Sequence, residues 1–283
     1  MSYDLNDLRA MTDAIDDADR LVTFGKYLPS KEATDGLARE IDRLCIDGHK
    51  VSLIMADVVT GSGAAYRSGI PMCAQSTVKA VYAGALVEQD LNALNEHGQD
   101  LRDAIEFSDN DAYARLRAAY GPGPLRRWCA ETGVGPGFAD PDYPRTYTAR
   151  DMFRLWTRLF AFLEADVTGF RELYTDTSAS ATRKRLGGRY RVYTKAGWEC
   201  GLDERKNYDP DAPVPARFTD GDPTNDECAV NDTGVVYAPN GPYIFVVYTD
   251  WPFGVFRDYA TPNPLYDLVD ALYEYHASLG DKR

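Results

Sequence analysis

Apolar residues recur along this chain at two spacings, and each spacing predicts a different kind of element. Strand-like runs fall in two blocks near the two ends of the chain. They span residues 51–59, 64–69, 190–199, 230–237 and 243–249. The turn sequence Thr60-Gly61-Ser62-Gly63 separates the first two runs, and Pro239-Asn240-Gly241-Pro242 separates the last two, so the pattern predicts two hairpins.

Helical spacing fills most of the chain between these blocks, and it also occurs before the first block and after the second. It is found at residues 4–21, 31–46, 76–92, 101–119, 125–132, 148–160 and 265–272. Ser30 and Thr148 stand where a helix-capping side chain is expected. Residues 133–147 have Gly and Pro breaks without periodicity and predict a surface loop, whereas the polar segment 201–227 has the composition of an insertion.

This order of elements predicts an α+β fold, a sandwich of helices on an antiparallel sheet of about five strands. The sheet is expected to come from residues of about 50–70 and 190–250, with a helical lobe over about 76–165 between them. We expect a helical extension at 1–29 and one domain over 30–283, since 283 residues are enough for one large core.

Composition narrows the classes of partner. The chain is 44% hydrophobic, which is ordinary for a globular protein. Its net charge of −13 would repel nucleic acid and anionic membranes, so we expect neither as a partner. There is no apolar run of 18 residues, and the first 21 residues lack the basic and apolar segments of a secretory signal. We therefore expect a cytoplasmic protein, unless an N-terminal segment has been removed.

Cysteine and histidine are too few and too widely spaced for a structural cluster. The chain has five cysteines, three histidines and no Cys-x-x-Cys pair, so we expect neither a disulfide framework nor a metal, and we expect no cofactor. The partner expected is a small-molecule or peptide-like substrate. The sequence leaves open the natural substrate and the oligomeric state.

Three short motifs follow one another with the chemistry of a serine acyl-transfer site. Ser76 and Lys79 are three residues apart, so on a helix they share one face, and a lysine with a lowered pKa can take a proton from a hydroxyl. Backbone N–H groups at a helix start can also stabilise an oxyanion. Taken alone, however, this spacing is common in exposed helical turns.

The second and third motifs supply the remaining groups. In Ser108-Asp109-Asn110 a hydroxyl can relay a proton and a carboxamide can hold an amide, although the same residues can simply cap a helix. In Lys195-Ala196-Gly197 a cation lies beside a glycine that permits close backbone approach. A lone lysine on a strand is more often just exposed, and it is the ordered combination of the three motifs that favours a site.

The flanking residues carry a family resemblance. Residues 71–79, 107–112 and 231–239 resemble the corresponding segments of class A β-lactamases and penicillin-binding, D,D-peptidase-like serine hydrolases. The resemblance implies that Ser76 attacks a carbonyl and that Lys79 takes or relays its proton. It also implies that Ser108, assisted by Lys195, protonates the leaving nitrogen. The substrate-binding positions that it implies are Asn110, Ala196, Gly197 and Trp198, with the N–H groups of Ser76 and Trp198 as the oxyanion hole.

Three departures from the family pattern change the expected activity. Residues 133–147 contain no Glu to activate a deacylating water. Only Asp140 and Asp142 are acidic there, and the sequence leaves open whether either one takes that water-activating role. Ala196 replaces a hydroxyl that would bind a substrate carboxylate, and Val230 stands where several members have a basic or hydroxyl residue. The connection from Ser76 to Ser108 is also shorter than in class A enzymes. The pattern therefore predicts acylation with weak or no β-lactam turnover.

Two alternatives remain open at this point. The lost carboxylate contacts also fit a non-catalytic binding protein on the same scaffold. A serine-dependent glutaminase-like amidase uses the same Ser-x-x-Lys spacing.

Overall fold

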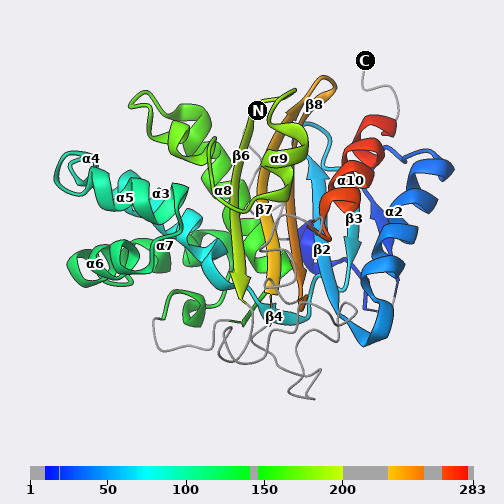
Figure 1. Ribbon diagram of the computed structural model, residues 1–283, viewed down its shortest axis with the longest axis horizontal. Helices are drawn as coiled ribbons and strands as arrows, with labels where there is room; N and C mark the ends of the chain where they lie inside the picture. Colours follow the sequence, from blue (N-terminus) through cyan, green and yellow to red (C-terminus); the bar gives the residue numbers. More distant parts are fainter. Residues whose placement is uncertain (1–9, 19, 141–145, 200–228, 252–262, 280–283) are drawn as a thin grey trace, which may run out of the picture.

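An antiparallel sheet of six strands, in the order β1-β3-β2-β8-β7-β6, runs through the centre of the molecule (Figure 1). The computed structural model describes residues 10–18, 20–140, 146–199, 229–251 and 263–279. The strands are β1 (Val22–Phe24), β2 (Val51–Asp57), β3 (Gly63–Tyr66), β6 (Val192–Glu199), β7 (Ala229–Ala238) and β8 (Gly241–Thr249). The predicted α+β fold and both predicted hairpins are confirmed.

The central strands are buried on both faces, because helices cover both sides of the sheet. Along β2, Leu53 and Met55 belong to one hydrophobic cluster and Ile54 belongs to the other. Alternate residues of a strand point to opposite faces, so an unbroken apolar run is what a doubly covered strand requires.

Helices α2 (Lys31–Leu44), α9 (Ala181–Leu186) and α10 (Tyr266–Ser278) contribute to the cluster on one face. Helix α8 (Ala149–Ala165) packs against β2 and β8 on the other face and contacts the helical lobe. The lobe, on the left in Figure 1, consists of α3 (Val78–Gln89), α4 (Ala93–Glu96), α5 (Gly98–Glu106), α6 (Asn110–Tyr120) and α7 (Gly123–Thr132). The predicted range of about 76–165 therefore spans the lobe, α3 to α7, and also α8, which packs on the sheet.

Short 3-10 helices complete the described elements. They are η1 (Ile46–Gly48), η2 (Gln75–Thr77), η3 (Pro136–Ala139) and η4 (Phe170–Tyr174). Both predicted caps are present: the Ser30 side chain accepts a hydrogen bond from Ala33 N at the start of α2, and the Thr148 side chain accepts one from Asp151 N at the start of α8.

Four local predictions differ from the structure. The helix expected over 4–21 ends at residue 13, and the described residues 14–18, 20 and 21 are not helical. Residues 22–24, placed in a helical extension, form strand β1, which pairs with β3 and makes six strands instead of five. The helix expected over 101–119 is broken into α5 and α6 at Phe107, Ser108 and Asp109. The loop over 133–147 contains η3 and ends in β5 (Thr146–Thr148), which pairs with β4 (Pro71–Cys73). Each is a short segment whose structure depends on a distant partner, and local periodicity does not report such partners. The predicted insertion at 201–227 lies outside the described residues.

Candidate active site

Ser76 lies in η2, the turn that leads directly into α3. The preceding Gln75 has φ +48°, in the left-handed region that side chains seldom adopt, and the Thr77 hydroxyl donates to Ala74 O at 2.8 Å. The turn is thus held in a strained conformation by its own hydrogen bond, and strained backbone of this kind is concentrated at functional sites. Ser76 itself is half-buried.

Lys79 lies one turn further along α3 and is almost completely buried, with 3% of its surface exposed. Its ammonium group donates to Ser108 O at 2.5 Å, to Asn110 Oδ1 at 2.6 Å and to Asp109 O at 3.3 Å. Lys79 therefore joins α3 to the second motif. Ser76 in η2 and Lys79 in α3 are three positions apart, as the sequence predicts.

The break between α5 and α6 presents the hydrogen-bond acceptors that Lys79 uses. Ser108 has φ +61°, and the Asp109 side chain accepts a hydrogen bond from Ala112 N at 2.6 Å to cap α6. The predicted capping role is therefore real, and it coexists with the contacts to Lys79. The left-handed residue turns the Ser108 carbonyl towards the lysine, while Asn110 stays exposed at the start of α6.

The Ser108 hydroxyl is buried, and it has no hydrogen-bond partner within the part of the chain that the structure describes. A buried hydroxyl without a partner costs about 1–3 kcal/mol, so folded proteins seldom retain one without a use for it.

Lys195 lies in β6 and is fully buried. Its amine donates to Ala196 O at 3.1 Å and lies 5.6 Å from the centre of the Trp198 ring. Burial lowers the pKa of Lys195 well below its ordinary value, the nearby Lys79 charge lowers it further, and Asp232 opposes both effects. The Lys79 charge therefore acts on Lys195, so the first and third motifs lie near each other.

Gly197 places the edge of β6 directly against the turn that carries Ser76. A Cβ atom at this position would lie 2.6 Å from Ala74 O and 3.0 Å from Ser76 N. The close approach that was predicted for this glycine is therefore present. The next residue, Trp198, is half-buried, and Ala196 is buried. All eight predicted site residues lie in the three segments that meet here.

Two polar residues of β7 support this region and were given no role from the sequence. Asn231 donates to Cys73 O at 2.7 Å and accepts from Thr249 N at 2.9 Å, so it ties the strands to the segment before Ser76. Asp232 is buried beside it. The sequence signal was the adjacent pair of polar residues within an otherwise apolar strand.

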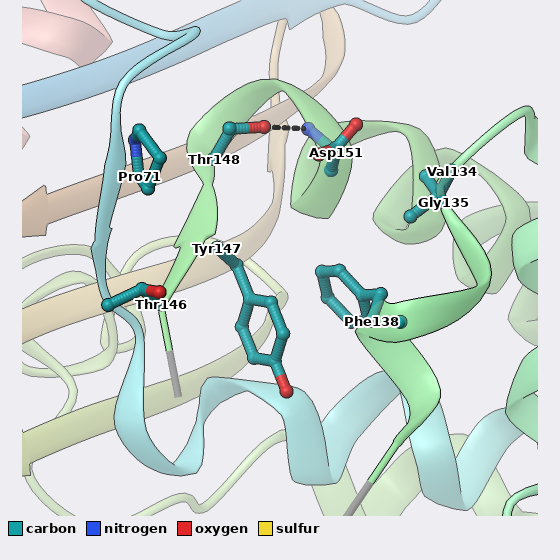
Figure 2. Close-up of a pocket in the computed structure, with 9 residues that line it drawn as sticks. Pro71, Val134, Gly135, Phe138, Thr146, Tyr147, Thr148 and Asp151 are labelled. Atoms are coloured by element: carbon teal, nitrogen blue, oxygen red, sulfur yellow. Dashed lines mark hydrogen bonds between the residues drawn. The ribbon is translucent and has the colours of Figure 1, made fainter. Parts of the chain in front are cut away.

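A separate pocket of about 210 Å³ lies beside the predicted loop and not at Ser76. Figure 2 shows it between η3, β5, the start of α8 and Pro71, with Phe138 stacked on Tyr147 at a ring distance of 3.9 Å. Asp151 is the acidic residue of its lining. Asp140 directly follows η3, and Asp142 lies outside the described residues, so the water-activating role suggested for either one stays a prediction.

Within the described ranges, no group of three or more His, Cys, Asp or Glu side chains could hold a metal ion. No helix in those ranges is both long and apolar enough to cross a membrane.

Comparison with known proteins identifies relatives of this arrangement. A model of the beta-lactamase enzyme family matches residues 96–275, which is more than half of the chain and includes Ser108 and Lys195 but begins after Lys79. No curated protein matches the chain.

Solved structures share the fold over most of its length. TLA-3 extended-spectrum beta-lactamase has a TM-score of 0.60 at 14% identity, covering 86% of this chain and 99% of that one. A beta lactamase from Burkholderia vietnamiensis has a TM-score of 0.60 at 18% identity, with 89% and 98% covered. A class A beta-lactamase from Bacteroides cellulosilyticus DSM 14838 has a TM-score of 0.59 at 16% identity, with 87% and 99% covered. At these identities the similarity describes the fold.

Proposed function

Because the chain belongs to the beta-lactamase enzyme family, we propose that it is a serine hydrolase that forms an acyl-enzyme on Ser76 with an amide, lactam or ester substrate. The observation that carries the proposal is the junction of the three motifs. Lys79 donates hydrogen bonds to the Ser108–Asn110 segment, and Gly197 packs against Ser76 N.

The proposed acylation step assigns a role to the groups of all three motifs. The Ser76 oxygen attacks the carbonyl carbon while Lys79, in its neutral amine form, accepts the hydroxyl proton, directly or through Ser108. The N–H groups of Ser76 and Trp198 stabilise the negative oxygen of the tetrahedral intermediate. The bond to the leaving nitrogen or oxygen then breaks, Ser108 delivers its hydroxyl proton to that atom, and the protonated Lys79 returns a proton to Ser108.

Release of the acyl group is the step for which the chain lacks an evident base. Water must attack the Ser76 ester, and a general base must lie within hydrogen-bonding reach of that water. The segment 133–147 has no Glu, and the apolar Ala196 and Val230 remove contacts to a substrate carboxylate. We therefore propose that β-lactams acylate Ser76 and that the resulting acyl group is hydrolysed slowly or not at all.

Intact-mass spectrometry over time with benzylpenicillin tests this proposal. We expect a persistent adduct of one drug molecule on Ser76, which is absent in Ser76→Ala and retained in Ser278→Ala. Ser278 is a suitable control because its hydroxyl donates to Tyr275 O, far from the motifs in sequence. Rapid hydrolysis of the drug without a lasting adduct would contradict the deacylation proposal.

A fluorophosphonate probe separates the remaining outcomes. Labelling of Ser76 without penicillin binding would retain the serine hydrolase and direct attention to other esters or amides, with ammonia release from glutamine as the next assay. If neither reagent modifies Ser76, the non-catalytic binding function is favoured and the enzyme proposal fails.

A further inference from the structure

Asp232 is a buried carboxylate on the face of the sheet opposite Lys195. It is 1% exposed, and its Oδ2 atom accepts from the Ser180 hydroxyl at 3.0 Å and from Thr182 N at 2.8 Å. Both donors belong to the start of α9, so Asp232 fastens this helix to β7. This much is a structural role.

The second carboxylate oxygen is not explained by that role. Asp232 Oδ1 is buried and forms no hydrogen bond with any residue that the structure describes. Burying a charged group normally requires a partner for it, because desolvation costs several kcal/mol. A charge retained under these conditions is expected to interact with another charge nearby.

Strand register identifies Lys195 as that charge. Asp232 pairs with Ala196 and Lys195 pairs with Thr233, so Asp232 and Lys195 are diagonal neighbours on adjacent strands. Adjacent strands are about 5 Å apart, and alternate side chains point to opposite faces. The two side chains therefore lie on opposite sides of the sheet with only backbone between them.

Among the described residues, Asp232 is the negatively charged group that acts on Lys195. Lys79 on α3 and Asp232 on β7 are the charged groups that act on Lys195. On η4, Arg171 and Glu172 act on Tyr193 instead. On α9, Arg183 pairs with Asp176 and Arg185 with Asp270.

We propose that Asp232 is a positioning residue of the serine site, whose carboxylate acts on Lys195 through the sheet and opposes the loss of the Lys195 proton beside Lys79. The proposal rests on the proposed function, since it assigns Lys195 the task of assisting proton delivery by Ser108. Burial raises the pKa of Asp232 to about 6, so the carboxylate is ionised at and above neutral pH, where its charge is needed.

The test compares Asp232→Asn with Ser180→Ala. Asparagine keeps an oxygen for the bonds from Ser180 and Thr182 and places its amide where Oδ1 lies, so α9 stays fastened while the charge is lost. Ser180→Ala removes one of those bonds and leaves the charge. The side-chain signal of Lys195, followed by NMR as pH rises and assigned from its absence in Lys195→Gln, reports its protonation directly.

We expect Lys195 to lose its proton about one pH unit lower in Asp232→Asn than in the wild-type protein, and at the same pH in Ser180→Ala. The alkaline limb of the Ser76 acylation rate should move by the same amount. In the wild-type protein, the Lys195 signal should also shift near pH 6 as Asp232 ionises.

Three results have separate meanings. An unchanged Lys195 titration in folded Asp232→Asn overturns the proposal and leaves Asp232 as a helix fastener. If that variant does not fold, a missing step near pH 6 in the wild-type protein overturns it equally. If Ser76 is never acylated, the proposed function fails, while the NMR titration still decides whether Asp232 controls Lys195.

Discussion

At the scale of single residues, Gly197 is the position with the least freedom to change. Its missing side chain lets β6 approach the Ser76 turn, and a Cβ atom there would meet backbone atoms of Ala74 and Ser76. Backbone cannot rotate away as the end of a flexible side chain can. A substitution must therefore move either the strand or the nucleophile.

We predict that Gly197→Ala lowers the rate of Ser76 acylation by about 100-fold, because a displacement of about 1 Å in a reacting group has an effect of that size. The cost in unfolding free energy should be about 1–3 kcal/mol, as for other overpacked sites. Fluorophosphonate labelling rates and urea unfolding measure the two effects. Gly98→Ala is the matched control, since no atom lies within 4 Å of the Cβ it would add. Equal labelling rates in both variants would show that the approach of β6 is not needed.

At the scale of elements, the segment before β1 is fixed to α8 by polar contacts that local periodicity does not reveal. Asp17 has a side chain that is only 4% exposed, and it accepts from Ser68 N at 2.7 Å and from Arg150 at 3.1 Å. Arg150 also donates to Ile15 O at 3.0 Å. By contrast, Asp35 on α2 forms an ion pair with Lys31 in which both side chains are exposed, 49% and 87% respectively.

We predict that Asp17→Asn lowers the free energy of unfolding by about 1–3 kcal/mol, because it weakens a buried charged network. Asp35→Asn should change it by less than about 0.5 kcal/mol, as is usual for exposed ion pairs. Chemical denaturation gives both numbers, and limited proteolysis should cut the Asp17→Asn protein faster within residues 10–18. Equal effects of the two substitutions would contradict the distinction by burial.

At the scale of the whole molecule, the buried carboxylate of Asp232 makes stability depend on pH. Folding raises its pKa from the ordinary 3.8 to about 6, so the folded state holds this proton more tightly than the unfolded state does. The stabilisation is fully present below pH 3.8 and is lost as pH rises through 6. A change of this size corresponds to about 3 kcal/mol.

Asp232→Asn cannot lose that proton, and we predict that it becomes more stable relative to the wild-type protein as pH increases from 4 to 7.5, by up to about 3 kcal/mol. Urea unfolding of both proteins at the two pH values measures the change. Because other carboxylates titrate alike in both proteins, they cancel in the difference. A difference that does not vary with pH would mean that Asp232 is not perturbed by burial.

Much of the architecture could be predicted because it depends on near neighbours in the chain. The apolar run at 51–59 specifies a strand covered on both faces, the capping residues Ser30 and Thr148 mark helix starts, and the turn sequences mark both hairpins. The order of the three motifs likewise identified the residues that form the candidate site.

What only the tertiary structure decided involves segments far apart in sequence. A three-residue strand such as β1 exists because β3 offers it hydrogen bonds, and its own pattern is too short to predict it. The same holds for the bonding of Lys79 to the Ser108 turn and for the burial of Lys195 opposite Asp232. Composition and spacing determine which groups the chain carries. The packing of β6 against η2, β7 and α9 determines which of these groups are buried away from water and which interact electrostatically.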